Sequence, residues 1–522
     1  MIFVVPIIKF FYNFLAENPD LSKSRIKAKN YTLRRTEGIA KENLGFQLGS
    51  SKLWKKTPDF QSGEVYKNRP LLLIIFIALF LRLFRINQAF PFDYDQEVPA
   101  SAAYDFFINH KITLIGQELS FKGFFLGPLH NWIQFIPYGI CNLKPDCVPY
   151  FYTMIGILTV IILYLVVKRI FDIKTATMSS AIYAISFSAI SFERGVNSNY
   201  FLFLVSVGLL FCLYTYFLGK NKYIIFGAFI AGIATVNFNP IYIFSTIAFF
   251  VTALIRKSRK LAFFLIAFIA FAINYLPLLI FNARHHNILW SNFLAFTNQN
   301  AIVSDYFGRF IFLTKNVLVS FYSNFLFQNA SIIFILFTTF LVLWGLINLL
   351  KTKNKFLLFF PIWISSVLFG FTLYKGWVPD YYFQQTLLPL AIIIAFTIRK
   401  NFVIFLIFIS IFLFINIKRD VNYNTVINYK VKKDAVNFVI NDSKGETFNV
   451  YYQMPLALNT GYRFLFKVFG ELPLEGGRNL YIFEFEEPSY YLKLKYQKAF
   501  PSKKVDVGFD EFVKIVSIKN VN

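Results

Sequence analysis

Long apolar runs separated by short polar segments occupy the chain between residues 71 and 417. About eleven of these runs are long enough to cross the hydrocarbon core of a bilayer, and the pattern predicts a membrane-spanning helix in each. A further run at 124–140 is shorter, and we interpret it as a re-entrant or juxtamembrane helix. The predicted cores of the spans are 71–86, 149–167, 175–192, 200–218, 223–236, 240–255, 261–281, 331–350, 356–374, 386–398 and 402–417.

The segments between these runs differ in charge from one side of the membrane to the other. Basic clusters follow every second run: "KRIFDIK" from Lys168, "GKNK" from Gly219, "RKSRK" from Arg256, "KTKNK" from Lys351 and "RKN" from Arg399. In the eleven-span scheme these clusters share one side with the basic segment 1–70, and the positive-inside rule identifies that side as cytoplasmic. The opposite side then carries 88–148, 193–199, 282–330, 375–385 and everything from residue 418.

Both ends of the chain differ from the membrane domain 71–417. Residues 1–16 are apolar but contain Pro6 and Lys9, so they form either an interfacial helix or a misassigned start. Residues 418–522 have a mixed pattern that predicts a small extracytoplasmic α/β domain. Its predicted helices are 432–442 and 458–470, and its predicted strands are 447–454, 479–487 and 512–520.

Composition agrees with a polytopic α-helical protein of the plasma membrane. The 522 residues are 56% hydrophobic and only 16% charged, with a mean hydropathy of +0.52. The net charge of +25 would ordinarily suggest nucleic acid, but Lys and Arg gather in the short segments between apolar runs, so we exclude nucleic acid as a partner. Three cysteines are too few for a disulfide framework; Cys141 and Cys147 either pair in an extracytoplasmic loop or remain separate thiols.

Three carboxylates follow the first apolar run in the stretch "PFDYDQE". Asp93, Asp95 and Glu97 occupy alternate positions of a predicted outer loop. In a partly desolvated cleft, such carboxylates can act as a general base or bind a divalent metal, whereas in a solvated loop they have no such role. Arg82 and Arg85, at the end of the preceding run, either snorkel to the interface or balance these acids.

Two further outer segments are rich in polar and aromatic side chains. In "ERGVNSNY", 193–200, either Asn197 or Ser198 caps the next helix, or Arg194 contacts an anion. The stretch "YKGWVPDYYFQQTLLP", 374–389, is typical of an interfacial aromatic belt, part of which can line a groove for a lipid headgroup. A shared metal site among the outer histidines would also need a carboxylate ligand. These histidines are His110, His130, His285 and His286.

The order of these motifs resembles the GT-C class of membrane glycosyltransferases, in the branch of protein O-mannosyltransferases and of the aminoarabinose transferases that modify lipid A. The resemblance covers residues 71–417 and rests on five stretches in sequence: "FDYDQE", "GPLHNWI", "ERGVNSNY", "LPLLIFNARHH" and "YYFQQTLLPL". It implies transfer of a sugar from a polyprenyl-phosphate donor to a lipid, glycan or protein acceptor on the outer face. In this family the acid of the first outer loop is catalytic, and the match of "DQE" gives that role to Asp95.

The resemblance also suggests roles for other residues. Asp93 and Glu97 are expected to orient Asp95 or to hold a divalent metal. Cations expected at the donor phosphate are Arg194, Lys122, Arg284 and Lys375, and residues expected in the substrate cleft are His130, Asn197 and Tyr382.

Some positions depart from the family pattern. Aminoarabinose transferases have an acid and a lysine where this chain has Leu126 and Gly127, and Asn197 replaces their hairpin acid. Metal dependence and the identity of the sugar therefore remain open. The alternative is a transporter or flippase of a lipid-linked saccharide, which would need ionisable residues near the middle of its spans. A non-catalytic membrane scaffold is a second alternative.

Overall fold

A computed structural model describes most of the chain. The described residues are 62–119, 123–256, 261–298, 305–374, 376–399, 401–423, 427–455, 458–509 and 512–520. The predictions made for residues 1–61, for Lys122 and for Lys375 lie outside them.

Helices make up the membrane domain, because its long apolar runs can satisfy their backbone groups in a bilayer only within a helix. Short 3₁₀ or π-helical turns join or extend several of them: η2 (Pro145–Cys147), η3 (Ser198–Tyr200), η4 (Ala234–Phe238), η5 (Pro240–Tyr242), η6 (Ile273–Tyr275), η7 (Leu313–Leu318), η8 (Lys355–Leu358) and η9 (Asp380–Thr386). The α-helices are α3 (Ser62–Leu83), α4 (Ile86–Ala89), α5 (Tyr94–Phe107), α6 (Leu129–Ile140), α7 (Val148–Ile170), α8 (Ile173–Ile185), α9 (Phe187–Arg194), α10 (Phe201–Phe217), α11 (Tyr223–Ile233), α12 (Ile243–Leu254), α13 (Leu261–Ala272), α14 (Leu276–Arg284), α15 (Ile288–Asn298), α16 (Tyr306–Phe312), α17 (Val319–Phe327), α18 (Ile332–Lys351), α19 (Phe359–Leu373), α20 (Leu387–Ile398) and α21 (Phe402–Asn422).

Several helices are suited to cross a membrane, which confirms the predicted multi-pass, α-helical fold. Two shorter apolar helical stretches, Tyr223–Phe238 and Pro240–Leu254, accompany them. By length and hydropathy, the described part of the chain has seven that qualify: Pro145–Ile170, Ser198–Phe217, Leu261–Arg284, Tyr306–Phe327, Ile332–Lys351, Lys355–Leu373 and Asp380–Ile398.

Two segments differ from the sequence prediction. The predicted span 175–192 is interrupted at Ser186, where the backbone leaves the helical region and the hydroxyl donates to Phe325 O at 3.0 Å. The predicted outer loop 282–330 contains further helices. One helical stretch there, Tyr306–Phe327, is long and apolar enough to cross a membrane. Its polar residues, such as Lys315, obscured the helical pattern in the sequence.

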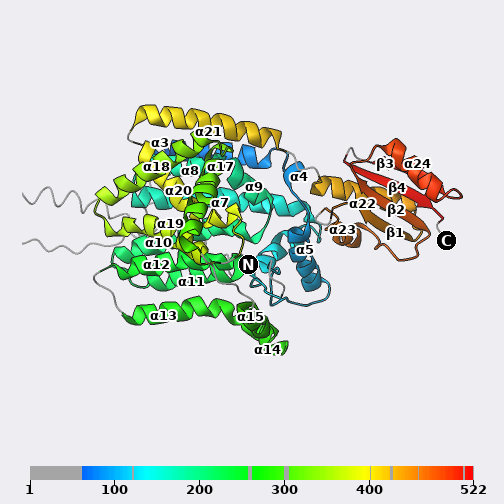
Figure 1. The fold of residues 1–522 in the computed structure, drawn as a ribbon, viewed down its shortest axis with the longest axis horizontal. Coiled ribbons are helices and arrows are strands. Elements are labelled where there is room, and N and C mark those ends of the chain that lie inside the picture. Colours follow the sequence, from blue (N-terminus) through cyan, green and yellow to red (C-terminus); the bar gives the residue numbers. More distant parts are fainter. Residues whose placement is uncertain are drawn as a thin grey trace, which may run out of the picture. The chain divides into compact units, whose positions relative to one another are not determined.

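The C-terminal domain is a four-stranded sheet with helices on both faces (Figure 1). The strand order is β1-β2-β4-β3, with β1 parallel to β2 and the other pairs antiparallel. The predicted elements are all present, and the structure adds one helix, α24, and one strand, β3, which the sequence analysis did not predict. The elements are α22 (Tyr429–Ser443), β1 (Phe448–Gln453), α23 (Tyr462–Phe469), β2 (Asn479–Phe485), α24 (Ser489–Ala499), β3 (Lys504–Phe509) and β4 (Val513–Lys519).

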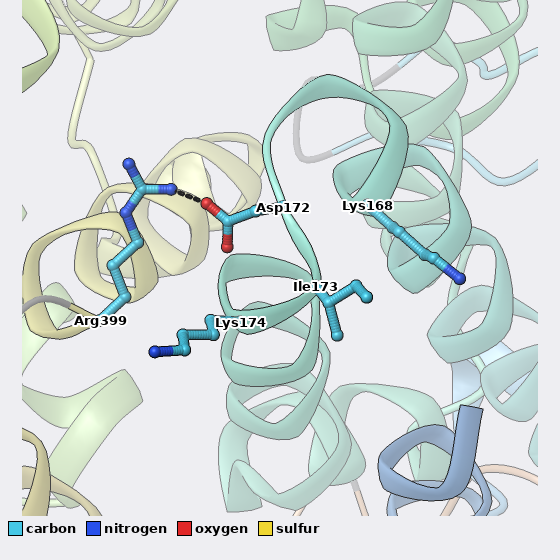
Figure 2. Close-up of a pocket in the computed structure, with 5 residues that line it drawn as sticks. All are labelled: Lys168, Asp172, Ile173, Lys174 and Arg399. Atoms are coloured by element: carbon cyan, nitrogen blue, oxygen red, sulfur yellow. Dashed lines mark hydrogen bonds and ion pairs between the residues drawn. The ribbon is translucent and has the colours of Figure 1, made fainter. Parts of the chain in front are cut away.

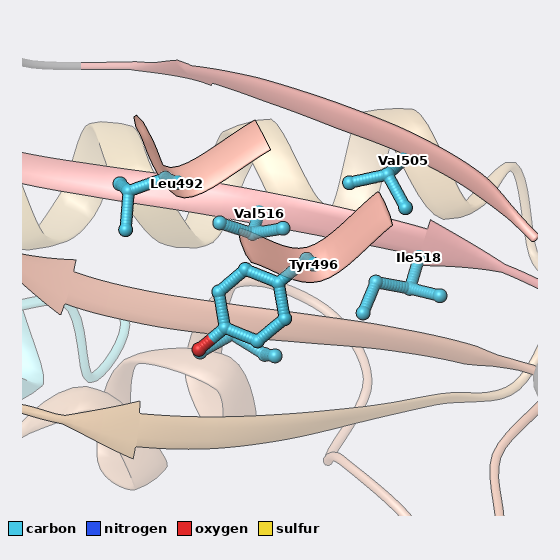
Figure 3. Packing of buried hydrophobic residues seen from close by; sticks show 6 residues of the cluster. Leu492, Tyr496, Val505, Val516 and Ile518 are labelled. Carbon is cyan, nitrogen blue, oxygen red and sulfur yellow. The ribbon is translucent and has the colours of Figure 1, made fainter. Parts of the chain in front are cut away.

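Burial on both faces explains the nearly continuous apolar pattern of β2. On one face, α24 packs against the sheet through Leu492 and Tyr496 (Figure 3). On the other face, Tyr481 of β2 donates to Asp442 of α22 at 2.8 Å. The strand residues that complete the α24 core are Ile482, Val505, Val516 and Ile518.

Contacts between basic segments agree with their predicted location on one side of the membrane. Arg399, after α20, forms an ion pair with Asp172, before α8, beside an open pocket that Lys168, Ile173 and Lys174 also line (Figure 2). A second such contact joins Arg256 to Asn221, with 2.7 Å between the guanidinium and the amide oxygen. The segments near 170 and 399, and those near 221 and 256, are therefore neighbours in space.

Candidate functional site

The acid motif forms the first turn of a helix, which corrects the predicted loop. Asp93 is the N-cap of α5 and forms a capping box with Gln96, whose Oε1 accepts from the Asp93 backbone N–H at 2.8 Å. Asp95 and Glu97 follow in the first turn, where carboxylates interact favourably with the helix dipole. Cap and acidic first turn together explain why the helix begins at this point.

Gln96 connects the acid motif to the hairpin "ERGVNSNY". Its side chain is buried, and Nε2 donates to Gly195 O at 2.5 Å. Two motifs that are about a hundred residues apart in the chain therefore lie side by side, because this hydrogen bond links residues separated by 99 positions.

Asp95 has a partly buried carboxyl group with one neutral partner. Nε2 of Gln117 donates to Oδ1 of Asp95. Burial raises the pKa of Asp95, the hydrogen bond from Gln117 lowers it, and the nearby negative charge of Asp93 raises it; the net pKa is above the ordinary value. Among the described residues, hydrogen bonds to Asp95 involve Oδ1 alone, so Oδ2 can accept a proton.

The other two acids contact the C-terminal domain. Lys432 Nζ of α22 lies 2.6 Å from Asp93 Oδ1, and the backbone N–H of Gly461 donates to Glu97 Oε2 at 2.9 Å. Within the described ranges, no group of three His, Cys, Asp or Glu side chains is arranged to hold a metal ion. The three acids therefore have distinct environments, and Asp95 is the one that faces a neutral amide.

The aromatic segment near residue 380 lies within electrostatic range of the acid motif. The charge of Asp95 interacts electrostatically with the Tyr381 hydroxyl, although the two residues are far apart in the sequence. Tyr382, a predicted cleft residue, stacks on Phe371 with 5.8 Å between ring centroids. Arg309, which the sequence did not single out, donates to Gly376 O at 2.7 Å and holds this segment against α16.

The arginines around the hairpin are buried in ion pairs. Arg82 does not balance the acid motif as one prediction had it; it pairs with Glu193 instead, because both side chains are enclosed by the same helices. Arg194 donates to Leu81 O at 2.7 Å, and its Nη1 lies 3.8 Å from Asp420 Oδ1. Asn197 is partly buried and does not cap the following helix, because its side chain makes no capping hydrogen bond.

The remaining predicted site residues are dispersed. His130 is buried and lies 2.7 Å from Tyr152 Oη, and burial lowers the pKa of His130 to about 3, so its ring is neutral. Arg284 is exposed at the end of α14. His285 stacks on Phe281 with 4.0 Å between ring centroids.

The position of the family lysine is closed in this chain. Gly127 donates its backbone N–H to Val236 O at 2.8 Å, and a Cβ at residue 127 would lie 2.3 Å from Asn237 Oδ1. Any side chain here would displace Asn237, which also accepts from the Leu129 backbone at 3.2 Å. The glycine is therefore required by local packing.

Cys141 and Cys147 form a disulfide at the end of α6, with 5.9 Å between their Cα atoms. Of the two alternatives left open by the sequence, the paired one is correct. The third cysteine, Cys212, is a buried free thiol in α10.

Sequence reasoning missed Gln117, Lys432 and Gly461, all of which contact the acid motif. Gln117 lies in an irregular segment, and the other two lie more than 330 positions from the motif. A lysine in a helix or a glycine in a turn is ordinary, so no local pattern distinguishes them.

Comparisons with known proteins add two findings. Residues 126–281, from the residue before the stretch "GPLHNWI" into α14, match the sequence family described as dolichyl-phosphate-mannose-protein mannosyltransferase. The comparison with curated proteins found no match.

The fold is similar to that of solved membrane proteins. The crystal structure of ArnT from Cupriavidus metallidurans bound to undecaprenyl phosphate aligns with a TM-score of 0.56 and 11% identity, over 88% of this chain and 98% of that one. The apo state of the same protein gives the same TM-score and identity over 87% and 98%. The archaeal oligosaccharyltransferase AglB from Archaeoglobus fulgidus, with an inhibitory peptide and a dolichol-phosphate, aligns at 0.46 with 12% identity, over 79% and 64%.

The alignment with ArnT covers 88% of this chain, and the family match lies inside the membrane domain. The family match and the shared fold both support the predicted resemblance of this multi-pass membrane protein to glycosyltransferases of the GT-C class.

Proposed function

We propose that the protein transfers a sugar from a polyprenyl-phosphate donor to an acceptor hydroxyl on the extracytoplasmic face, with Asp95 as the catalytic base. The observation that carries this proposal is the environment of Asp95. It is the acid of the motif that the C-terminal domain leaves unpaired, and a neutral amide, Gln117, donates to it. The ArnT structure with bound undecaprenyl phosphate supports the class of donor.

In this mechanism Oδ2 of Asp95 takes the proton of the acceptor hydroxyl as its oxygen attacks the anomeric carbon. A new carbon–oxygen bond forms while the bond to the donor phosphate breaks, and the polyprenyl phosphate leaves with the electron pair. Attack in line with the leaving group inverts the anomeric centre. The raised pKa of Asp95 makes its carboxylate a stronger base than an exposed aspartate.

The departing phosphate needs nearby positive charge. Arg284 is an exposed candidate, and Lys122 and Lys375 remain proposals from the sequence. Arg194 is a weaker candidate for direct contact, because its guanidinium donates to Leu81 O and Phe84 O inside the protein.

The test combines purified protein, a polyprenyl-phosphate sugar and candidate acceptors, and measures release of polyprenyl phosphate. Asp95→Asn is expected to lower the rate by about a hundredfold or more, because the amide cannot take the proton. The matched control is Asp105→Asn, which changes an exposed carboxylate on the same helix. Wild-type turnover by Asp95→Asn would refute the assigned role.

The same assay separates the proposal from a transporter or flippase, which would move the donor without releasing polyprenyl phosphate. Buried charges do occur in the helices, but Arg82, Glu193 and Asp420 lie in the last turns of α3, α9 and α21. These turns are at helix ends rather than midway along the spans, so they do not favour transport.

A further inference from the structure

Lys432 is a buried cation in contact with the acid motif. Its side chain is fully buried, whereas the side chain of its ion-pair partner Asp93 is 37% exposed. Lysine is rarely enclosed in this way unless its charge is paired and its N–H groups are used. Its position in the first turn of α22 makes it part of the C-terminal domain.

The ammonium group of Lys432 joins two parts of the chain. Nζ donates to Asp93 Oδ1 at 2.6 Å and to Phe92 O at 2.9 Å, both in the acid motif. It also donates to Thr460 O at 2.9 Å, in the turn before α23. Three acceptors match the three N–H groups of a protonated lysine, whereas a neutral amine has only two. The contact geometry therefore corresponds to the charged form.

Asp93 links this cation to Asp95. As the N-cap, Asp93 fixes the first turn of α5, in which Asp95 stands two residues later. Its negative charge also acts on the Asp95 carboxyl group. Without Lys432, the start of α5 would lose two hydrogen bonds, the turn before α23 would lose one, and the charge of Asp93 would be unpaired.

Resting on the proposed function, we propose that Lys432 is a positioning residue that acts on Asp95 through Asp93, so that the C-terminal domain completes the active site. The domain contributes a second contact through Gly461, whose backbone N–H donates to Glu97. The domain thus contacts the first and third acids of the motif, Asp93 and Glu97, and leaves Asp95 available for the reaction.

Other charged and titratable groups surround this contact. On α5 they are Asp95 and Glu97, and the Tyr462 ring of α23 lies 5.3 Å from Lys432 Nζ. The neighbouring Lys433 pairs with Asp146 at 2.6 Å, away from the acid motif. It provides a matched control of the same residue type on the same helix.

The experiment compares Lys432→Met with Lys433→Met in the full-length protein. For Lys432→Met we expect kcat to fall by about tenfold to a hundredfold, in line with small displacements of catalytic groups, with little change in KM for the donor. The acid limb of the pH profile should move to higher pH, because the unpaired charge of Asp93 makes Asp95 harder to ionise. Adding Asp93→Asn to Lys432→Met should reverse that movement, since Asn still caps the helix but has no charge.

A readout without turnover keeps this proposal separate from the proposed function. Hydrogen exchange of the backbone amides in the first turn of α5 should accelerate in Lys432→Met and stay unchanged in Lys433→Met. If wild type releases no polyprenyl phosphate, the proposed function fails, while the exchange result still tests positioning. An unmoved acid limb, no recovery in the double variant, or unchanged exchange would each overturn the role of Lys432. Equal effects of Lys432→Met and Lys433→Met on every measurement would do the same, because they would indicate general destabilisation.

Discussion

Arg82 and Glu193 form a two-point ion pair inside the membrane domain, with 2.6 Å from Nε to Oε2 and 2.8 Å from Nη2 to Oε1. Both side chains are at most 3% exposed, and Tyr183 donates a further hydrogen bond to Oε1 at 3.1 Å. Gly156 leaves the space for this approach, because a Cβ there would lie 2.3 Å from Oε2. The pair fixes α3 against α9, which ends at the hairpin that contacts the acid motif.

Arg82→Met should destabilise the protein strongly, because it leaves the Glu193 carboxylate buried without its partner. Removing one member of a buried pair costs about 3–5 kcal/mol. The measurement is the midpoint of thermal unfolding in detergent. Arg85→Met is the control: Arg85 is exposed in the turn between α3 and α4, and its substitution should leave the midpoint nearly unchanged. Equal midpoints for the two variants would contradict the importance of the pair.

Gly461→Ala should disturb the acid motif directly. A Cβ at this position would lie 2.2 Å from Phe92 O, and φ of +84° is unfavourable for alanine. Because a backbone oxygen cannot rotate away, the turn must shift and lose the hydrogen bond to Glu97. Both the unfolding midpoint and the initial rate are expected to fall.

Gly445→Ala is the control for Gly461→Ala, because it measures the cost of placing alanine at a positive φ without a steric clash. Its φ of +82° is almost the same, but no atom lies within 4 Å of the added Cβ. It should incur only the left-handed backbone cost of about 1–2 kcal/mol and keep its activity. The interpretation fails if Gly445→Ala and Gly461→Ala lose activity to the same degree.

The sequence predicted much of this architecture because apolar runs, basic clusters and strand patterns are local signals. It also ranked Asp95 first in the motif, through a family resemblance. The sequence did not predict the partners of the motif. Lys432 contacts Asp93, and Gly461 contacts Glu97, although most of the chain lies between the two residues of each pair. Such contacts depend on how the C-terminal domain packs, and no spacing rule encodes them.

The pH dependence of turnover should reveal the hydrogen bond between Gln117 and Asp95. Asp95 must be ionised to accept a proton, so activity falls as the pH decreases through its pKa, which burial holds above the ordinary value. Gln117→Leu removes a donor that favours the ionised form, so the pKa rises further. The acid limb of kcat/KM should therefore move to higher pH.

A matched amide–carboxylate pair serves as control for Gln117. Asn109 donates to Asp105 at 2.8 Å near the other end of α5, on an exposed surface. Asn109→Leu should leave the acid limb in place. Coincident pH profiles for wild type and Gln117→Leu would show that Asp95 does not govern the titration.

The disulfide between Cys141 and Cys147 is expected to form in the cell, since the predicted outer side of the membrane is oxidising. Under denaturing conditions, alkylation should label one cysteine before reduction and three afterwards, the single one being Cys212. Replacing both paired residues with serine should destabilise the protein by about 2 kcal/mol, because the bridge closes a short loop. Labelling of all three cysteines without reductant would contradict the bridge.

Orientation in the membrane follows from the charge pattern and can be tested directly. A reporter that is active only outside the cytoplasm, fused to the C-terminus after residue 522, should be active. The same reporter inserted between Lys220 and Asn221 should be inactive, because that basic hairpin is predicted to be cytoplasmic and contacts Arg256 of another basic cluster. The contact of Lys432 with Asp93 ties the acid motif to the side that carries the C-terminal domain. If the two fusions gave the reverse pattern, the acid motif would face the cytoplasm and the proposed extracytoplasmic transfer would be wrong.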